Sequence, residues 1–482
     1  MKHIKACVEV LSASEIEQID GAARTVLEQV GAHVPNQEVL KLCAENGAEV
    51  DYQQEKIRIP KTVIGELIEA LRARKVLEVD TYIRKPKAKI STQIYMYDYM
   101  TQTRRLGLAD DVLKGICLLN QLESFETTKS IVIPSDVPEI LADIVSFHML
   151  FTYSTKPGGT YVLSAKSAPY IIAMLKAMGR PCSYFLETVS PLGYQKTSLD
   201  IALAFAREGG TLTNGPMVMA GATGPMSIAG TMTLATAEIL LSIFVNYSLT
   251  GKLDEQYSNS CHTMDPQTML CSFGLPNQAL FAAASAQMAR YYGLRCATNS
   301  AMTDALACDF QNGMEKAAGL VFAALSGCAS TGCMGIAGAD QGLSLEQIVL
   351  DNEMFRYVNY ILDGFEVNEH ALAVEAIREV GIGGNFLYSE HTLDYLHSDY
   401  LSSNLFAREA FGGNRTDLLD RAAQLVTAYT KDYKALAPVI PGEKAKELDY
   451  ILACARKELA WLCEWAYSAK ISRSFTFLLL SA

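Results

Sequence analysis

Polar side chains that directly follow apolar, strand-like runs are the residues of this chain best suited to chemistry. In parallel α/β folds the carboxyl ends of the strands meet on one face, and ligands bind there. The chain has no GxSxG or HExxH motif and no recognisable Ser/His/Asp order, so neither a serine hydrolase nor a zinc peptidase is indicated. The candidate positions are Asp136, Glu187, Ser190, Thr223, His262, Asp304, Asp340 and His391.

Asp304 and His391 are the candidate catalytic residues within this set. Asp304 follows the predicted strand Arg295–Ser300, whereas Asp309 beyond it suits the cap of the next helix. His391 follows the glycine-rich run Gly381–Asn385 and suits an anion-binding or acid–base role. A structural histidine remains the alternative interpretation at that position.

A run of tyrosines offers a candidate cation site. Tyr95, Tyr97 and Tyr99 recur at every second residue, so on a strand they would share one face. Aromatic faces attract organic cations. An aromatic strand that packs on the core is the alternative interpretation of the same spacing.

The stretch 214–241 predicts a strand, a tight loop and a long helix, Thr231–Leu249. Glycines in the loop Gly221–Pro225 let the backbone approach a ligand, and amides at the start of a helix attract anions. The alternative is a turn that only packs tightly. The loop is neither GxGxxG nor a Walker motif, so it does not indicate a nucleotide.

Strand-like runs alternate with helical patterns from about residue 126 onward, although the final step is irregular. This alternation predicts an α/β protein with a (β/α)8 TIM barrel, and a doubly wound sheet is the alternative. The predicted strands are Ser130–Pro134, Thr160–Ser164, Ser183–Glu187, Pro216–Ala220, Glu255–Ser260, Arg295–Ser300, Thr331–Ile336 and Asn385–Tyr388.

The barrel is expected to occupy residues 76–414, between two helical regions. Residues 1–75 predict an N-terminal α-rich lobe that begins with a capping box between Ser12 and Glu15. Residues 415–482 predict C-terminal helices, Asp417–Leu436 and Glu443–Lys470, that pack on the barrel or form a contact in a homo-oligomer.

Composition limits the cellular location and the classes of binding partner that we expect for this protein. Among 482 residues, 50% are hydrophobic and the net charge is −12, which argues against nucleic acid or an anionic membrane as partner. No signal peptide and no uninterrupted apolar run of membrane-spanning length is apparent, so we expect a cytoplasmic protein. The 12 cysteines form no CxxC pattern, and neither a metal site nor a disulfide framework is predicted.

Several blocks in order resemble the trimethylamine methyltransferase family of corrinoid-dependent methyltransferases, over nearly the whole chain. The blocks are LSASEIEQIDGAARTVLEQVGAHVP near the start, SDVPEI at 135–140, STKP at 154–157, SPL at 190–192, GATGPMSIAGTMTLATAEIL at 221–240, the group Asp304, Gln311 and Glu315, GADQGLSLEQIVLDNEMF at 338–355 and GIGGNFLYSEHT at 381–392. The resemblance implies a TIM barrel. Founding members carry pyrrolysine, which this sequence lacks, so it resembles the branch that demethylates quaternary amines.

For this chain, the resemblance implies methyl transfer from a betaine or carnitine-like amine to the Co(I) corrinoid of a partner protein, in anaerobic one-carbon metabolism. The corrinoid-binding motif DxHxxG is absent, so we expect the cofactor to arrive on that partner. We expect cation binding at Tyr95, Tyr97 and Phe355, and carboxylate binding at Arg356 and His391. Glu187 is a further expected substrate-binding residue. The expected approach of the corrinoid is over Gly221, Ala222 and Gly224.

Two other functions remain open on the sequence. One is a barrel that binds betaines without catalysis. The other is an unrelated lyase or aldolase, which needs a strand-end lysine with a lowered pKa. Only Lys156 and Lys166 lie near predicted strand ends, so this function ranks last. The sequence does not identify which quaternary amine is the substrate.

Overall fold

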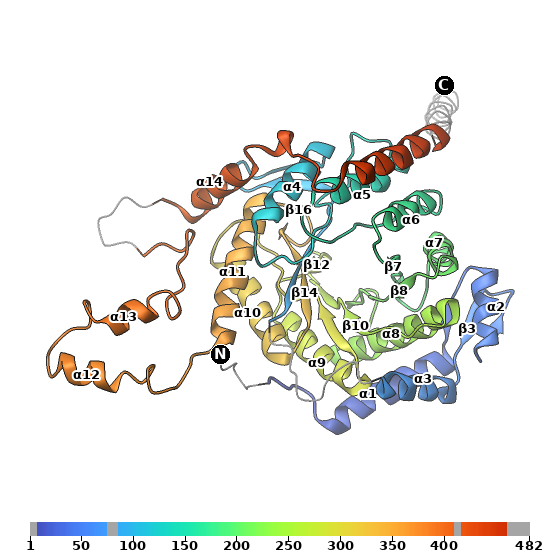
Figure 1. Ribbon diagram of the computed structural model, residues 1–482. Coiled ribbons are helices and arrows are strands. Elements are labelled where there is room, and N and C mark those ends of the chain that lie inside the picture. Colours follow the sequence, from blue (N-terminus) through green and yellow to red (C-terminus); the bar gives the residue numbers. More distant parts are fainter. Residues whose placement is uncertain (1–6, 75–84, 409–415, 460–482) are drawn as a thin grey trace.

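The computed structural model of the 482-residue chain describes residues 7–74, 85–408 and 416–459. It is a mixed α/β structure in which short strands occupy the centre and helices surround them (Figure 1). Buried side chains from Ile19 to Leu459 form one continuous apolar core. The N-terminal helices, the strands and the C-terminal helices share this core, so their division into domains stays a prediction.

The N-terminal helices pack against the longest helix, α8 (Ile228–Thr250). The predicted capping box is confirmed, because Ser12 Oγ accepts from Glu15 N at 3.3 Å and the Glu15 carboxylate accepts from Ser12 N at 2.7 Å. The elements are α1 (Ala13–Gln29), β1 (Ala32–His33), α2 (Gln37–Glu45), β2 (Glu49–Asp51), β3 (Lys56–Arg58) and α3 (Lys61–Ala73). β2 and β3 pair antiparallel as a hairpin in this region.

By length and composition α8 is apolar enough to cross a membrane, and it is the one such helix in the described residues. However, 78% of its apolar stretch is buried inside the protein. Helices α1, α2 and α3 cover it on one side, and α7 and α9 also contact it. Its apolar composition is therefore that of a central core helix.

A row of parallel strands forms the centre of the molecule. β4 (Lys87–Ile90) pairs with β14 (Ser330–Met334), β14 pairs with β13 (Arg295–Thr298), and β13 pairs with β10 (Gln256–Asn259). All of these pairs are parallel, as the alternation of strands and helices predicts.

Beyond β10, the row of parallel strands continues with the extended segment at residues 216–218. Backbone bonds of 3.0–3.1 Å join residues 260 and 262 to residues 216 and 218, and β11 lies parallel to β9. β7 lies parallel to β8 at this end of the row. The strands are β7 (Ser183–Phe185), β8 (Thr211–Thr213), β9 (Met219–Ala220) and β11 (His262–Met264).

The other end of the row consists of single parallel bridges. Gln93 bridges to Val132, and Thr128 bridges to Gly158. The predicted strands Ser130–Pro134 and Thr160–Ser164 fall in these segments but are not regular strands. In the described residues no pairing joins Gly158 to β7, so the strands form several sheets and not one closed ring.

Helices alternate with these strands and cover the outside of the row (Figure 1). The predicted helix Thr231–Leu249 is confirmed, and most of the helical patterns between the predicted strands also correspond to helices. The helices of this part are α4 (Ala109–Gln121), α5 (Ala142–Tyr153), α6 (Ala168–Ala177), α7 (Lys196–Arg207), α9 (Asn277–Tyr292), α10 (Phe310–Ser326) and α11 (Leu345–Asp363), with a 3-10 turn at Glu139–Leu141.

Short additional strands lie at the carboxyl ends of the parallel strands. β5 (Tyr95–Asp98) pairs antiparallel with β6 (Thr103–Leu106), and β16 (Gly342–Leu343) pairs antiparallel with β15 (Ile336–Ala337) and parallel with β5. β12 (Cys271–Ser272) pairs with β11.

The eighth predicted strand, Asn385–Tyr388, is wrong. Gly381 and Gly383 have φ of +68° and +79°, and the segment is an exposed turn without a partner strand. β4, which the sequence analysis did not identify, lies beside β14 instead.

The chain between α11 and α14 makes a long excursion away from the central strands (Figure 1). Its helices, α12 (Val374–Val380) and α13 (Glu390–Tyr395), bury no residues. α14 (Leu418–Thr430) then packs against α11 and α4, a 3-10 turn follows at Tyr433–Ala435, and a helix covers 442–459. The remainder of the predicted helix Glu443–Lys470 and the final tail lie outside the described residues. An oligomer contact stays a prediction.

A buried polar network connects β5, α10 and α11. The Tyr99 hydroxyl donates to Gln347 Oε1 at 2.8 Å, and Asn312 Nδ2 donates to the same oxygen at 2.9 Å. Gln347 Nε2 in turn donates to Asp351 Oδ1 at 2.8 Å. A buried network of this kind fixes the relative positions of the elements that supply it.

Asp351 is the centre of this network. Lys316 Nζ lies 3.2 Å from Asp351 Oδ1, with the two side chains only 2% and 1% exposed. Asp351 Oδ2 accepts from Gly335 N at 2.7 Å, where β14 turns into β15. Burial raises the pKa of Asp351, and the charge of Lys316 opposes that shift.

We predict that Asp351→Ala lowers the free energy of unfolding by about 3–5 kcal/mol, because it leaves the Lys316 ammonium buried without a counter-charge. Denaturant unfolding followed by circular dichroism measures the change. The matched control is Lys196→Ala in the exposed pair with Asp200, which should cost below about 1 kcal/mol. An equally small loss for both variants would contradict this account of Asp351.

Candidate functional site

Titratable side chains from neighbouring strands meet inside the row of parallel strands. Lys129 Nζ lies 5.4 Å from the centroid of the Tyr161 ring, and the charges of Glu187 and Asp340 act on Tyr161. A Cβ built on Gly332 would lie 3.4 Å from Lys89 Cβ, which places Lys89 beside β14. We call this group the interior cluster; its members are Lys89, Lys129, Tyr161, Glu187, Cys333 and Asp340.

The two lysines of the interior cluster are positive charges in a poorly solvated place. Burial, together with the charge of Lys129, lowers the pKa of Lys89 to about 8. Burial also lowers the pKa of Lys129, while Cys333 and Glu187 oppose that shift. Neither ammonium group has a hydrogen bond or an ion pair with another described residue. A lysine in this state readily binds an anion.

The acidic members have the opposite electrostatic character. Burial raises the pKa of Glu187, and Lys129 opposes the shift. Burial also raises the pKa of Asp340, although the Gln93 amide donates a hydrogen bond to its carboxylate. Burial raises the pKa of the Tyr161 hydroxyl, so the ring stays neutral at physiological pH.

Water nevertheless reaches the interior cluster. The side chain of Tyr161 is 43% exposed, and Glu187 and Asp340 are exposed as well. Groups that contact water while protein atoms shift their pKa values are typical of a recessed site that receives a ligand. Both cationic and anionic groups are available there.

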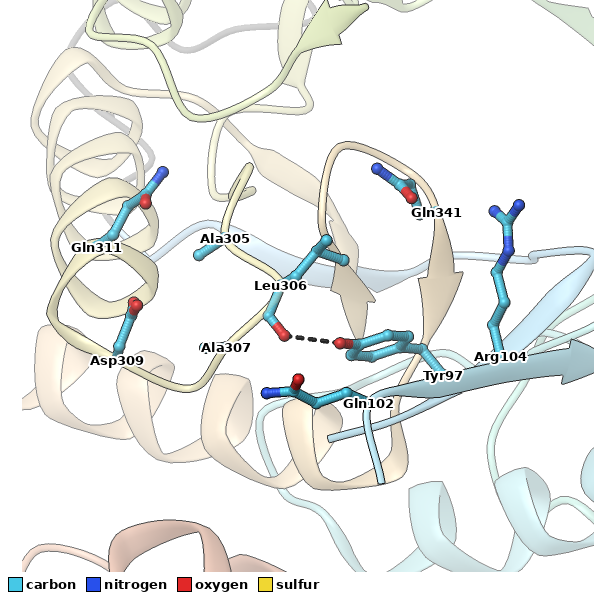
Figure 2. Close-up of a pocket in the computed structure, with 9 residues that line it drawn as sticks. All are labelled: Tyr97, Gln102, Arg104, Ala305, Leu306, Ala307, Asp309, Gln311 and Gln341. Carbon is cyan, nitrogen blue, oxygen red and sulfur yellow. Dashed lines mark hydrogen bonds between the residues drawn. The ribbon is translucent and has the colours of Figure 1, made fainter. Parts of the chain in front are cut away.

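A cavity of about 470 Å³ adjoins the turn that carries Asp340 (Figure 2). The Tyr97 ring forms part of its wall, and the Tyr97 hydroxyl donates to the Leu306 carbonyl at 2.8 Å. Arg104 and Asp309 bring one charge of each sign to the lining. The remaining lining residues are polar or small: Gln102, Ala305, Ala307, Gln311 and Gln341.

The three tyrosines do not form one free cation wall. The guanidinium carbon of Arg104 lies 4.7 Å from the Tyr95 ring centroid, so a cation of the protein itself already covers that ring. Tyr99 belongs to the buried polar network, and its ring meets Tyr97 edge-on at 5.2 Å. Of these three tyrosines, therefore, only Tyr97 both lines the cavity and keeps the predicted role of a cation-binding residue.

Asp304 lies after β13, as predicted, but its carboxylate is fully engaged. It accepts hydrogen bonds from the Ser272 hydroxyl, from Phe273 N at 2.6 Å and from Gly274 N at 3.0 Å. Glu315 accepts in turn from Asp304 N at 2.9 Å. Asp304 thus anchors the loop after β12 and is not poised for proton transfer.

Phe355 and Arg356 lie on α11, outside the strands. Phe355 is 1% exposed within the main core, so it does not face a ligand as expected. Arg356 Nη1 donates to Glu353 Oε2 at 2.7 Å, and Arg356 Nε donates to Glu123. These two carboxylates already neutralise the guanidinium, and binding of a substrate carboxylate by Arg356 stays a prediction.

His391 lies on α13, in the exposed excursion. Its Nε2 lies 3.0 Å from the His370 carbonyl, and its ring stacks on Tyr395 at 4.6 Å. The structure does not bring it together with Tyr97 or with the interior cluster, because the excursion leads away from the strands (Figure 1).

The glycine loop after β9 is exposed at the carboxyl end of that strand, as predicted. Gly221 has φ +84°, and a Cβ there would lie 2.8 Å from Met226 Sδ. A Cβ on Gly224 would lie 2.4 Å from Val218 Cγ1, so this glycine is needed for packing. Ala222 N donates to the Met219 carbonyl at 3.1 Å, which closes the turn.

Most members of the interior cluster were not predicted from the sequence. Glu187 and Asp340 were predicted as strand-end residues, whereas Lys89 and Lys129 were not. The available signal was the alternation in 87–90, KAKI, where Ala88 and Ile90 are buried in the core and the lysines alternate with them.

A metal centre has no visible ligand set in the described part of the chain. No group of at least three His, Cys, Asp or Glu side chains is placed to hold an ion among these residues. His262 is buried, and burial lowers its pKa to about 3, so its ring is neutral.

Comparison with known proteins gives the family. The family model for trimethylamine methyltransferase (MTTB) matches residues 1–460. A glycine betaine methyltransferase of Desulfitobacterium hafniense (strain Y51) is 29% identical over 265 residues, or 55% of this chain and 55% of that protein. A trimethylamine methyltransferase of Methanosarcina barkeri (strain Fusaro) is 27% identical over 478 residues, or 93% of this chain and 96% of that protein.

Among solved structures, the monomethylamine methyltransferase of Methanosarcina barkeri matches with a TM-score of 0.44 and 11% identity, over 93% of this chain and 92% of that chain. The match of the family model over residues 1–460 decides the assignment: the chain belongs to the trimethylamine methyltransferase family.

Proposed function

We propose that this protein transfers a methyl group from a quaternary amine to the Co(I) corrinoid of a partner protein, and that the amine binds at the interior cluster. Membership of the trimethylamine methyltransferase family supports methyl transfer. The sequence contains only standard amino acids, and one relative is a glycine betaine methyltransferase, which together favour a quaternary amine.

The row of strands is proposed to curl into the (β/α)8 barrel that the sequence predicts. Along the row the segments follow one another in chain order, from β4 through Gly158 at one end and from β7 through β14 at the other. The charge of Glu187 after β7 acts on Tyr161 after Gly158, which supports an approach of the two ends. That approach would enclose the interior cluster.

The observation that carries the proposal is that Glu187 and Asp340 act on Tyr161; a substrate cation at this ring takes the place of Lys129, whose Nζ lies 5.4 Å from the ring centroid. An aromatic face contributes roughly 0.5–2 kcal/mol to binding of an organic cation. Glu187 and Asp340 both act electrostatically on this ring, and both attract a cation when ionised. A trimethylammonium group fits this chemistry, since it is a bulky cation that donates no hydrogen bond.

A quaternary amine also suits a site without an acid poised at the leaving group. Its nitrogen departs as a neutral amine, so the reaction requires no proton transfer. The residues then need only to bind the cation, aim one methyl group and exclude water. The corrinoid supplies the Co(I) nucleophile as the second substrate.

The glycine loop supports an approach of the corrinoid from the carboxyl ends of the strands. Residues Gly221–Gly224 are small, lie after β9, and are followed by Met226, which is exposed. A flat macrocycle can approach such a surface closely, because few side chains stand above the backbone. The corrinoid partner remains part of the proposal.

Lys89 favours one other function. A lysine with a pKa lowered to about 8 is the feature that the sequence analysis required of a lyase or aldolase. Such a lysine forms a Schiff base with a carbonyl substrate. Borohydride reduction in the presence of pyruvate or glyceraldehyde would trap that adduct as a mass increase on Lys89, and methyl transfer predicts no trapping.

The direct test is anaerobic incubation of the protein with cob(I)alamin and glycine betaine, proline betaine, carnitine, γ-butyrobetaine or trimethylamine. We expect loss of the Co(I) absorbance with one quaternary amine and none with trimethylamine. The assay is repeated with the cognate corrinoid protein. Binding of a betaine without transfer in either format would instead favour the non-catalytic barrel.

We predict that Tyr161→Leu weakens binding of tetramethylammonium by about 3- to 30-fold, which corresponds to loss of one cation–π contact. Tyr161→Phe is the matched control and should retain the affinity, because it keeps the aromatic face. Isothermal titration calorimetry measures both variants. Equal affinity for the leucine and phenylalanine variants would remove Tyr161 from the cation site.

A further inference from the structure

We propose that Lys89 and Lys129 together bind a carboxylate carried by the quaternary amine, so that the interior cluster selects zwitterions. This inference rests on the proposed function and adds to it the residues that recognise the anionic end. The expected carboxylate ligands, Arg356 and His391, do not lie near the cluster, so the recognition must come from other donors.

The strand β4 directs Lys89 into the interior. Ala88 and Ile90 are each 1% exposed and belong to the main core, so the alternating side chains Lys87 and Lys89 point to the opposite face. Lys87 Nζ is 2.5 Å from a Glu126 carboxylate oxygen, which neutralises it. Lys89 lies two residues further along the strand and forms no ion pair of this kind with a described residue.

The segment that carries Lys129 lies beside the segment that continues from β4. Gln93 N donates to the Ile131 carbonyl and Ile133 N donates to the Gln93 carbonyl, both at 2.9 Å. Lys89 and Lys129 therefore lie on neighbouring segments of the row. The charge of Lys129 accordingly lowers the pKa of Lys89. Two adjacent ammonium groups without an ion pair favour an anion shared between them.

The anionic and cationic sites lie at different depths. Lys89 lies within β4, whereas Glu187 and Asp340 follow β7 and β15 towards the carboxyl ends of the strands. A zwitterion that spans both sites places its carboxylate deeper among the strands and its trimethylammonium group nearer their carboxyl ends. The methyl groups then point to the side from which the corrinoid is proposed to approach.

The first test compares ligands with and without a carboxylate. Calorimetry with glycine betaine and tetramethylammonium is performed on the wild type and on Lys89→Met, Lys129→Met and Lys87→Met. For the two interior variants we expect glycine betaine to bind at least about 10-fold more weakly, since each loses a charged hydrogen bond. Their affinity for tetramethylammonium, and the behaviour of Lys87→Met, should stay within about 2-fold.

A second test needs no variant and therefore does not depend on folding. The wild type is labelled briefly with acetic anhydride, and acetylation of each lysine is measured by mass spectrometry. Glycine betaine should protect Lys89 and Lys129 at least about 5-fold and leave Lys87 unchanged, because a bound carboxylate holds both interior ammonium groups. Tetramethylammonium should protect neither interior lysine to that extent.

The outcomes separate this inference from the proposed function. Methyl transfer from glycine betaine with unprotected interior lysines, or with unchanged affinity in both interior variants, overturns the carboxylate site and leaves the function intact. Protection by acetate as well as by glycine betaine supports the site. Absence of transfer from every amine, with protection retained, refutes the enzyme activity and leaves the carboxylate site standing.

Discussion

The ion pair between Lys316 and Asp351 is the constraint on which the rest of the site depends. It lies on the outer side of the strands, where both groups are buried, and it extends through Gln347 to Tyr99. Charges held in this way contribute strongly to a specific arrangement, because removing either partner leaves the other without compensation. The same aspartate holds Gly335 at the end of β14. The network thereby sets where Cys333, Asp340 and the hairpin with Tyr97 lie.

The charged side chains of the interior cluster are arranged differently from this buried ion pair. The outer ion pair is satisfied within the protein, whereas neither Lys89 nor Lys129 forms an ion pair at contact distance with a described residue, although the charge of Glu187 acts on Lys129. Two poorly solvated cations that form no ion pair lower the stability of the folded protein, and a bound anionic ligand can offset this loss. Family membership connects this arrangement to methyl transfer, and Tyr161 with its acidic neighbours provides a place for the cationic end of a substrate.

Much of the fold follows from local sequence patterns. The Ser12 capping box, the helix at 231–249 and most of the alternating strands are confirmed, because caps, turns and apolar periodicity act within a few residues. β4 was missed because Lys89 points towards the interior cluster, where a charged residue is unexpected. Asn385–Tyr388 was wrong because strand-like residues alone do not supply a partner strand.

The candidate site could be predicted less completely than the fold, because it depends on contacts between residues that are distant in the chain. Glu187 and Asp340 were found from their positions after strands. The unavailability of Arg356 depends on Glu123, which lies far from it in the chain and pairs with it only in the folded protein. Similarly, Asp304 has the position expected of a catalytic residue, yet its carboxylate accepts hydrogen bonds from the loop at 272–274 and is not free to react. Such long-range pairings have no local signature in the sequence.

The most direct test of the account is the location of the bound substrate cation. Arsenobetaine, the arsenic analogue of glycine betaine, can be soaked into crystals and located by the anomalous scattering of arsenic. The account predicts one strong arsenic peak beside the Tyr161 ring, near Glu187, with the carboxylate directed towards Lys89 and Lys129. A peak in the Tyr97 cavity or beside His391, with the interior cluster empty, would contradict it.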